Sequence, residues 1–318
     1  MDSRNTRTGF GAAELMLLGV AAVWGASYAV AKQALLQLPV LEFLCLRFGI
    51  TFVLLLPALR PLWQGEAGRA LRVGGILGAN LLAVFVCETF GVSLTTASHA
   101  AFLISLCVAF TPLMEWWLLK RRPTGRVAAA VVLALAGAAL LSATGHDTAG
   151  TVLWTRGDGL IVLAALLRAL MICMTQRLAG TQALPALTLT ALQSGVIALG
   201  SAALAWLTPS RAWVALPADP QFWLQMAFLV LCCTLFAFLA QNHAASRISP
   251  SRVALLMGSE PAFGACVAAI WLGERVSPGG WAGGAMIVAA ALYVTLPPPP
   301  RRLSRSTLPI SDATRARR

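Results

Sequence analysis

The chain has 318 residues, of which 58% are hydrophobic and only 11% are charged, and its formal net charge is +12. A soluble domain carries about 25% charged residues, so this composition excludes a soluble globular protein, and its high hydrophobicity excludes a disordered chain. The sequence therefore predicts an integral membrane protein, whose basic excess has to be interpreted by position before a nucleic-acid partner is considered.

Ten apolar stretches of about 20 residues follow one another, each long enough to cross a bilayer as a helix. They lie at 13–36, 41–62, 72–92, 97–119, 127–145, 157–177, 185–208, 222–243, 251–272 and 279–296. The longest connection, around Pro209–Asp219, leaves no room for a soluble catalytic domain. We predict an all-α integral membrane protein with ten transmembrane helices, the first of which is retained rather than cleaved as a signal peptide.

The basic residues concentrate on one side of these spans. With a cytoplasmic N-terminus, cytoplasmic segments hold 18 of the 24 Lys and Arg residues, and the outer loops hold only Arg156, Arg211 and Arg275. Because cytoplasmic loops are enriched in basic residues, this bias predicts that both termini are cytoplasmic. The charge excess therefore indicates orientation in the cell's inner membrane rather than a nucleic-acid partner.

An internal repeat relates the two halves of the chain. At an offset of 153, Ser98–Arg122 aligns with Ser251–Arg275 with seven identities, and a second block aligns 38–41 with 184–187. Each half holds five helices, and because five is odd the second half inserts with the opposite orientation. We predict a cytoplasmic tail (1–12), a first five-helix repeat (13–146), a periplasmic connection (147–156), a second inverted repeat (157–296) and a basic, disordered cytoplasmic tail (297–318).

Short motifs add a family resemblance that covers nearly the whole chain. They are Trp24-Gly25-Ala26-Ser27-Tyr28, Leu46-Arg47-Phe48, Ser98-His99-Ala100-Ala101-Phe102-Leu103, Glu260-Pro261-Ala262-Phe263 and Trp271-Leu272-Gly273-Glu274-Arg275. Together they resemble the EamA-type branch of the drug/metabolite transporter superfamily. Within that branch, the sequence is similar to the YddG-like amino-acid exporters. The resemblance implies ten helices, no ATPase domain and transport of small metabolites, often the export of amino acids.

Six ionisable side chains fall inside the spans, where each costs several kcal/mol if it faces lipid. They are Lys32, Arg47, Glu88, Glu115, Arg168 and Glu260. At about 1.5 Å per residue, Arg168 and Glu260 both lie near the bilayer midplane. Two interpretations stay open: the pair binds the carboxylate and amino groups of a zwitterionic substrate, or it forms a structural salt bridge.

Gating or coupling residues are expected among the remaining groups near the path. Lys32 and Glu88, both placed near the outer boundary, could form a gate pair, or Lys32 could extend to the lipid headgroups. Pro261 lacks an amide donor and should disturb the helix just upstream, which suits a gating element and equally suits an ordinary kink.

Several neutral residues lie at depths that suit a substrate cavity. They are Trp24, Tyr28, Asn80, Ser105, Gln193 and Ser259. Trp24 could stack on an apolar substrate group or pack between helices, and Arg47 could contact substrate or anchor its helix. Glu115 is interpreted as structural, with Lys120 or Arg122 as its partner.

The sequence as a whole predicts a secondary transporter, most plainly an exporter of amino acids that works by alternating access at a midplane site. The alternative is an exporter or uniporter of other small organic compounds, drug-like, amphipathic or lipid-like, and a channel or membrane enzyme is a remote rival. No Walker-type, His-Glu-x-x-His or Gly-x-Ser-x-Gly motif occurs, so we expect no cofactor, no metal and no enzymatic activity. The partners are a small-molecule substrate and the lipid bilayer; proton coupling and the choice between monomer and dimer stay open.

Overall fold

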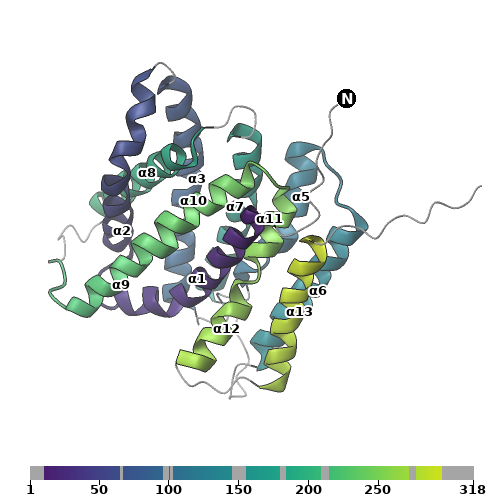
Figure 1. Cartoon of the computed structure of the whole chain (residues 1–318). Coiled ribbons are helices and arrows are strands. Elements are labelled where there is room, and N and C mark those ends of the chain that lie inside the picture. Colours follow the sequence, from purple (N-terminus) through teal and green to yellow (C-terminus); the bar gives the residue numbers. More distant parts are fainter. Residues whose placement is uncertain are drawn as a thin grey trace, which may run out of the picture.

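The computed structural model describes residues 11–64, 67–95, 100, 103–144, 155–179, 184–208, 215–271 and 277–295, and these residues form helices joined by short connections. The helices are α1 (Ala12–Ala34), α2 (Val40–Leu55), α3 (Ala67–Leu94), α5 (Cys107–Leu119), α6 (Gly125–Thr144), α7 (Arg156–Ala179), α8 (Ala186–Leu207), α9 (Pro220–Val230), α10 (Ala237–Ala245), α11 (Pro250–Met257), α12 (Glu260–Trp271) and α13 (Pro278–Thr295) (Figure 1). A π-helical turn, Leu231–Phe236, joins α9 to α10, and a 3₁₀ helix, Leu56–Gln64, follows α2.

These helices group into ten consecutive segments of the described chain, which confirms the all-α prediction. Six segments are long and apolar enough to cross a membrane, namely Ala12–Ala34, Val40–Arg60, Ala67–Leu94, Arg156–Leu178, Ala186–Leu207 and Pro220–Ala245. Large apolar side chains such as Leu199, Leu224 and Ile270 lie exposed on the outside of the bundle. Helices suit such sequences because every backbone hydrogen bond is made within the segment. Residues 1–10 of the predicted N-terminal tail, the predicted C-terminal tail and most of the connection 147–156 lie outside the described residues.

Two of the predicted continuous spans are interrupted. In the span expected over 251–272, α11 ends at Met257, Gly258 and Ser259 form a turn, and α12 restarts at Glu260. In the span expected over 97–119, α5 begins only at Cys107. The restarts at 107 and 260 are separated by 153 residues, the same offset that aligns the two sequence blocks. Pro261 stands at the start of α12, where its missing amide hydrogen is tolerated.

Close helix approaches bring both interruptions to the middle of the bundle. A Cβ atom on Gly25 of α1 would collide with the carbonyl oxygen of Glu260, and one on Gly258 would collide with Val108. Small residues allow such backbone contact inside membranes. The helices α6 and α13 pack on each other at one edge of the bundle (Figure 1), and one side of this pair contacts the junction, where Val108 packs with Ala134 and Ala290.

The end of the bundle at which α1 begins is here named the basic end, and the opposite end the far end. The basic end carries Arg72, Lys120, Arg177, Arg247 and Arg252, whose positions follow from the order of the helices. Side-chain contacts tie the start of α1 and the ends of α5 and α7 to the start of α11 at this end. The basic residues predict that it faces the cytoplasm.

Candidate functional site

A buried cluster of charges lies at the centre of the bundle. Arg168 of α7 places Nη1 3.2 Å from Oε2 of Glu260 and Nη2 3.5 Å from Oε2 of Glu88. The whole of Arg168 is 8% exposed and Glu260 is 3% exposed. The guanidinium carbon also lies 4.6 Å from the ring centre of Trp24, a distance suited to a cation–π contact. The two residues expected at the same depth are therefore in direct contact, and a second carboxylate joins them.

Glu88 lies deeper than its sequence position suggested. Its Oε1 accepts a 3.5 Å hydrogen bond from the Tyr28 hydroxyl, and its ion-pair partner is Arg168 rather than Lys32, which is exposed. Glu88 precedes the end of α3 by six residues, whereas Lys32 precedes the end of α1 by two. At about 1.5 Å per residue the two backbones differ by about 6 Å in depth, so an outer pair of Lys32 and Glu88 does not form.

The π-helical turn between α9 and α10 anchors two side chains of the site. Trp24 Nε1 donates to the carbonyl oxygen of Cys233 at 2.8 Å. Thr234 donates to the Leu229 carbonyl at 2.8 Å and accepts a 2.7 Å hydrogen bond from Nε of Arg47. A π-helical turn shifts the backbone hydrogen-bond pattern, and such turns are frequent at functional sites. Periodicity could not reveal this turn, because its apolar residues read as ordinary helix.

Arg47 of α2 is buried without a carboxylate partner in the part of the chain that the structure describes. It is 6% exposed, and none of the ion pairs formed by the described residues includes it. Its guanidinium carbon lies 5.3 Å from the ring centre of Phe48 and 5.5 Å from that of Phe85. Aromatic faces and one hydroxyl therefore hold the cation in place.

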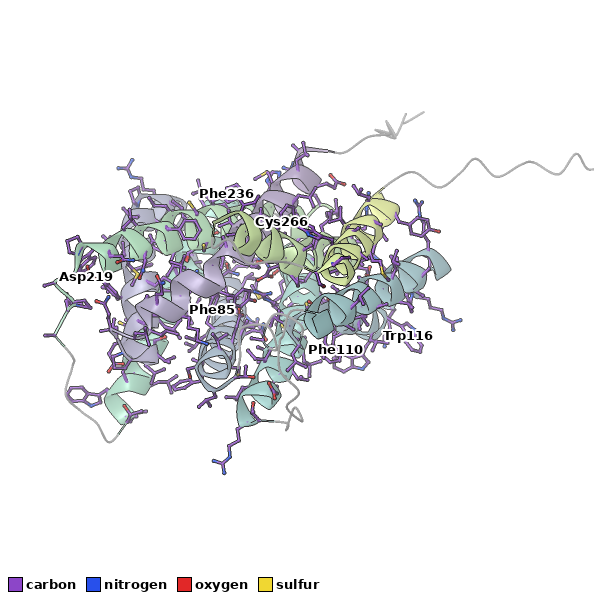
Figure 2. All side chains as sticks on the ribbon, turned by 90° about the horizontal axis from the view of Figure 1, so that it is seen from below. Phe85, Phe110, Trp116, Asp219, Phe236 and Cys266 are labelled. Carbon is purple, nitrogen blue, oxygen red and sulfur yellow. The ribbon has the colours of Figure 1, made fainter. Side chains whose placement is uncertain are left out.

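A narrow cavity of about 40 Å³, which amounts to about 510 Å³ of empty space when its open mouth is counted, runs from the charge cluster towards the far end. It is lined by Trp24, Ser27, Tyr28, Ala31, Leu35, Phe43, Arg47, Phe85, Glu88, Thr89, Val92, Arg168 and Glu260. Figure 2 shows Phe85 between the helices, well inside the bundle. The cavity combines two cationic groups, two carboxylates and aromatic walls, a lining that suits a small ligand with both charged and apolar parts.

A second, smaller cavity, of about 20 Å³, lies where the two interrupted helices meet. Its lining includes Ser105, Cys107 and Pro261, and it shares Arg168 and Glu260 with the first cavity. The ion pair therefore separates two hollows.

Three other predicted cavity residues line neither hollow. Asn80 donates to the Leu167 carbonyl at 3.1 Å, and Ser259 donates to the Leu256 carbonyl at 2.6 Å. Gln193 is fully buried, and its Oε1 accepts a 2.8 Å hydrogen bond from Asn242. Their hydrogen bonds lie within or between helices, so depth alone did not distinguish cavity residues from packing residues.

Glu115 contacts a different partner from the two that were expected. It accepts hydrogen bonds from the backbone and the hydroxyl of Ser251, and it forms no ion pair with Lys120 or Arg122, which are exposed at the end of α5. Among the described residues, no group of three or more His, Cys, Asp or Glu side chains could hold a metal ion.

A multi-pass helical bundle with a partly polar cavity at its centre defines a membrane transport protein. Residues 11–143 and 155–296 each match the EamA-like transporter family, so the chain belongs to that family, whose members are transporters rather than enzymes. An uncharacterized transporter of Archaeoglobus fulgidus is 27% identical over 291 residues, which cover 89% of this chain and 86% of the relative.

The fold is also similar to a solved structure. A crystal structure described only as that of a protein superposes with a TM-score of 0.66 at 21% identity, covering 89% of this chain and 96% of its own. At this identity the likeness concerns the fold alone. Membership of the EamA-like transporter family therefore establishes a transporter of small molecules in a membrane.

Proposed function

We propose that the protein is a secondary transporter that exports amino acids across the cell's inner membrane by alternating access. The observation that carries this proposal is the central cavity, in which Arg47, Arg168, Glu88 and Glu260 face one space. Each of these charges is costly at this depth unless it is paired or hydrated.

The charge set suits a zwitterion. Two cationic and two anionic groups give the lining no net charge, so a ligand that carries one charge of each sign can enter without leaving a net charge buried. Phe43, Phe85 and Trp24 offer apolar faces for an amino-acid side chain. A purely apolar ligand would gain nothing from the four charges, which is why amino acids are preferred here to lipid-like compounds.

The arrangement of the two ends supports alternating access. The cavity extends towards the far end as far as Leu35 and Val92. At the basic end, Arg252 lies 3.6 Å from Glu14, and Gln176 donates to the Ile248 carbonyl at 3.2 Å. We interpret this as the outward-facing arrangement of two inverted five-helix repeats, with the break at Gly258 and Ser259 as a hinge.

Counterflow in proteoliposomes tests this function. Purified protein would be reconstituted with an internal excess of one amino acid, and uptake of the labelled amino acid would be measured for each member of a panel, with and without a proton gradient. We expect at least one amino acid to exchange clearly faster than in empty liposomes, because a zwitterion crosses the apolar core of a bilayer only slowly without a carrier. Exchange of none of them would refute the substrate assignment.

Glu260→Gln provides the matched test of the site. The variant should slow exchange and flatten its pH dependence, because one of the two cavity carboxylates becomes neutral. Glu42→Gln, in the first turn of α2 and outside the cavity lining, is the control and should behave as the wild type. If Glu260→Gln left both rate and pH dependence unchanged, Glu260 would have no role in binding or coupling.

A further inference from the structure

The two arginines of the cavity differ in how their charges are compensated. Arg168 has a carboxylate on each side, at 3.2 and 3.5 Å, so its charge is already neutralised by the protein. Arg47 has no carboxylate partner among the described residues, although it is more than nine-tenths buried. A buried cation without a counter-charge is unfavourable unless a ligand or water supplies the compensation.

The guanidinium of Arg47 is also held in a fixed position. Thr234 binds only its Nε, at 2.7 Å, and Phe48 and Phe85 contact the group through their rings. No hydrogen bond to Nη1 or Nη2 is formed by the described residues, and Arg47 lines the cavity. Terminal N–H groups of a fixed guanidinium match the two oxygens of a carboxylate.

Glu88 offers the complementary charge on the same cavity. Its two contacts, to Tyr28 and to Arg168, are both as long as 3.5 Å, and its buried Oε2 makes no hydrogen bond. An ammonium group has three donors and would satisfy this oxygen at a normal distance. Glu260 is held more closely by Arg168, at 3.2 Å.

We propose that Arg47 binds the carboxylate of the substrate and Glu88 binds its ammonium group, while Arg168 remains the internal counter-ion of Glu260. This inference rests on the proposed function and assigns the two charged ends of the substrate to α2 and α3. It also makes Arg47 the residue that distinguishes amino acids from amines of the same shape.

The test compares three ligands that differ only in their charged groups. The amino acid exchanged fastest by the wild type would be used with its decarboxylated amine and its deaminated acid; for phenylalanine these are phenethylamine and 3-phenylpropionate. Binding to each variant in detergent would be measured by titration calorimetry, because the analogues can cross lipid unaided. Arg47→Gln should weaken the binding of the amino acid and of the acid by roughly 10- to 100-fold, the effect of one charged hydrogen-bonding pair. The binding of the amine should stay unchanged.

Glu88→Gln should give the opposite selectivity: it should weaken the binding of the amino acid and of the amine, but not that of the acid. Arg47→Lys keeps the cation and should recover part of the affinity for the acid, which separates charge from packing. Thr234→Val removes the hydrogen-bond acceptor of Arg47 Nε and leaves the charge, so it should weaken the binding of the amino acid and the acid less than Arg47→Gln does. Each variant would first be checked for a monodisperse elution profile and a wild-type unfolding midpoint.

The outcomes separate this inference from the proposed function. An active wild type whose Arg47→Gln variant loses all three ligands equally, or none, would overturn the assignment and leave amino-acid export intact. If Arg47→Gln fails to fold, the same comparison of the three ligands is made on Arg47→Lys, where an unchanged preference for amino acid over amine would overturn it. A wild type that exchanges no amino acid would overturn both proposals.

Discussion

The two halves of the bundle place different chemistry at equivalent positions. At the offset of 146 that relates the 38–41 block to 184–187, Arg47 of α2 corresponds to Gln193 of α8. At the offset of 153, Glu88 of α3 corresponds to Gln241 of α10. Arg47 and Glu88, in the first half of the chain, therefore line a cavity on the side of the far end. Their equivalents in the second half, Gln193 and Gln241, are buried amides on the side of the basic end.

Hydrogen bonds at equivalent positions support this correspondence. Asn80 of α3 donates to the carbonyl of Leu167, and Cys233, its equivalent at an offset of 153, donates to the carbonyl of Val23. Val23 and Leu167 are separated by 144 residues, as are the starts of the two family matches at 11 and 155. Each of these two contacts joins the two halves, and the repeat relates one contact to the other.

This difference in charge agrees with the outward-facing arrangement that we propose. Asn242 of α10 donates to Gln193 at 2.8 Å and to Thr190 at 3.0 Å, so neutral side chains hydrogen-bond to one another there, although Nε2 of Gln193 has no hydrogen-bond partner. Charged groups at the equivalent positions would cost more to bury, and a cavity that admits water or substrate lowers that cost. The charge asymmetry therefore favours the arrangement that opens to the far end.

Substitution of Arg168, at the junction of the two halves, should lower the stability of the protein the most. Arg168→Gln leaves Glu88 and Glu260 without their cation, and removing one partner of a buried pair costs about 3–5 kcal/mol. We expect a low yield of monodisperse protein and a lower unfolding midpoint in detergent, with partial recovery in the double variant Arg168→Gln/Glu260→Gln. Arg72→Gln, on the exposed surface of the basic end, is the control. A stable Arg168→Gln protein that had lost only substrate binding would instead make Arg168 a ligand of the substrate.

Substitution of Asn242, on the side of the basic end, should have the next largest effect on stability. Asn242→Leu leaves Oε1 of Gln193 without its partner, while the Thr190 hydroxyl keeps its bond to the Ala186 carbonyl, and an unsatisfied buried polar group costs about 1–3 kcal/mol. Amide hydrogens in 184–195 should exchange faster in hydrogen–deuterium exchange, while 196–207, towards the far end of the same helix, should keep its wild-type rate. Ser201→Ala removes a buried hydroxyl that has no hydrogen-bond partner and should change neither. Equal exchange in both segments would mean that these amides do not hold the basic end closed.

The sequence predicted much of the fold, because its strongest signals are long apolar runs and a repeated spacing. The ten segments, the common depth of Arg168 and Glu260 and the disturbance upstream of Pro261 follow from composition, helix geometry and the chemistry of proline, whereas depth alone left open whether those two charges pair or bind substrate. Depth along a helix does not report which way a side chain faces, so Asn80, Gln193 and Ser259 were expected in the cavity and lie in helix contacts. The π-helical turn and the late start of α5 depend on tertiary contacts that a periodic pattern does not contain.

The smallest effect is expected at the outer edge of the far end, where Asp219 lies away from the cavity (Figure 2). Its carboxylate accepts hydrogen bonds from the backbone of Gln221 and from Gln37 Nε2, both at 2.9 Å. These two donors lower the pKa of the Asp219 carboxyl below its ordinary value. The contact joins the connection after α1 to the start of α9, but it is fully exposed, so solvent screening keeps its contribution small.

The sign of its pH dependence follows from the lowered pKa. The contribution of Asp219 to stability is complete above the pKa of the unfolded chain, about 4, and is lost as the pH falls through the lower pKa of the folded protein. The unfolding midpoint of Asp219→Asn should therefore lie slightly below that of the wild type at pH 7, and the gap should close below about pH 4. Taking the difference between the two proteins removes the titration of the other carboxylates. A gap at pH 7 as large as that of Asn242→Leu would mean that the far end is fastened as firmly as the basic end, and the contrast between the two halves would then reside in the cavity charges alone.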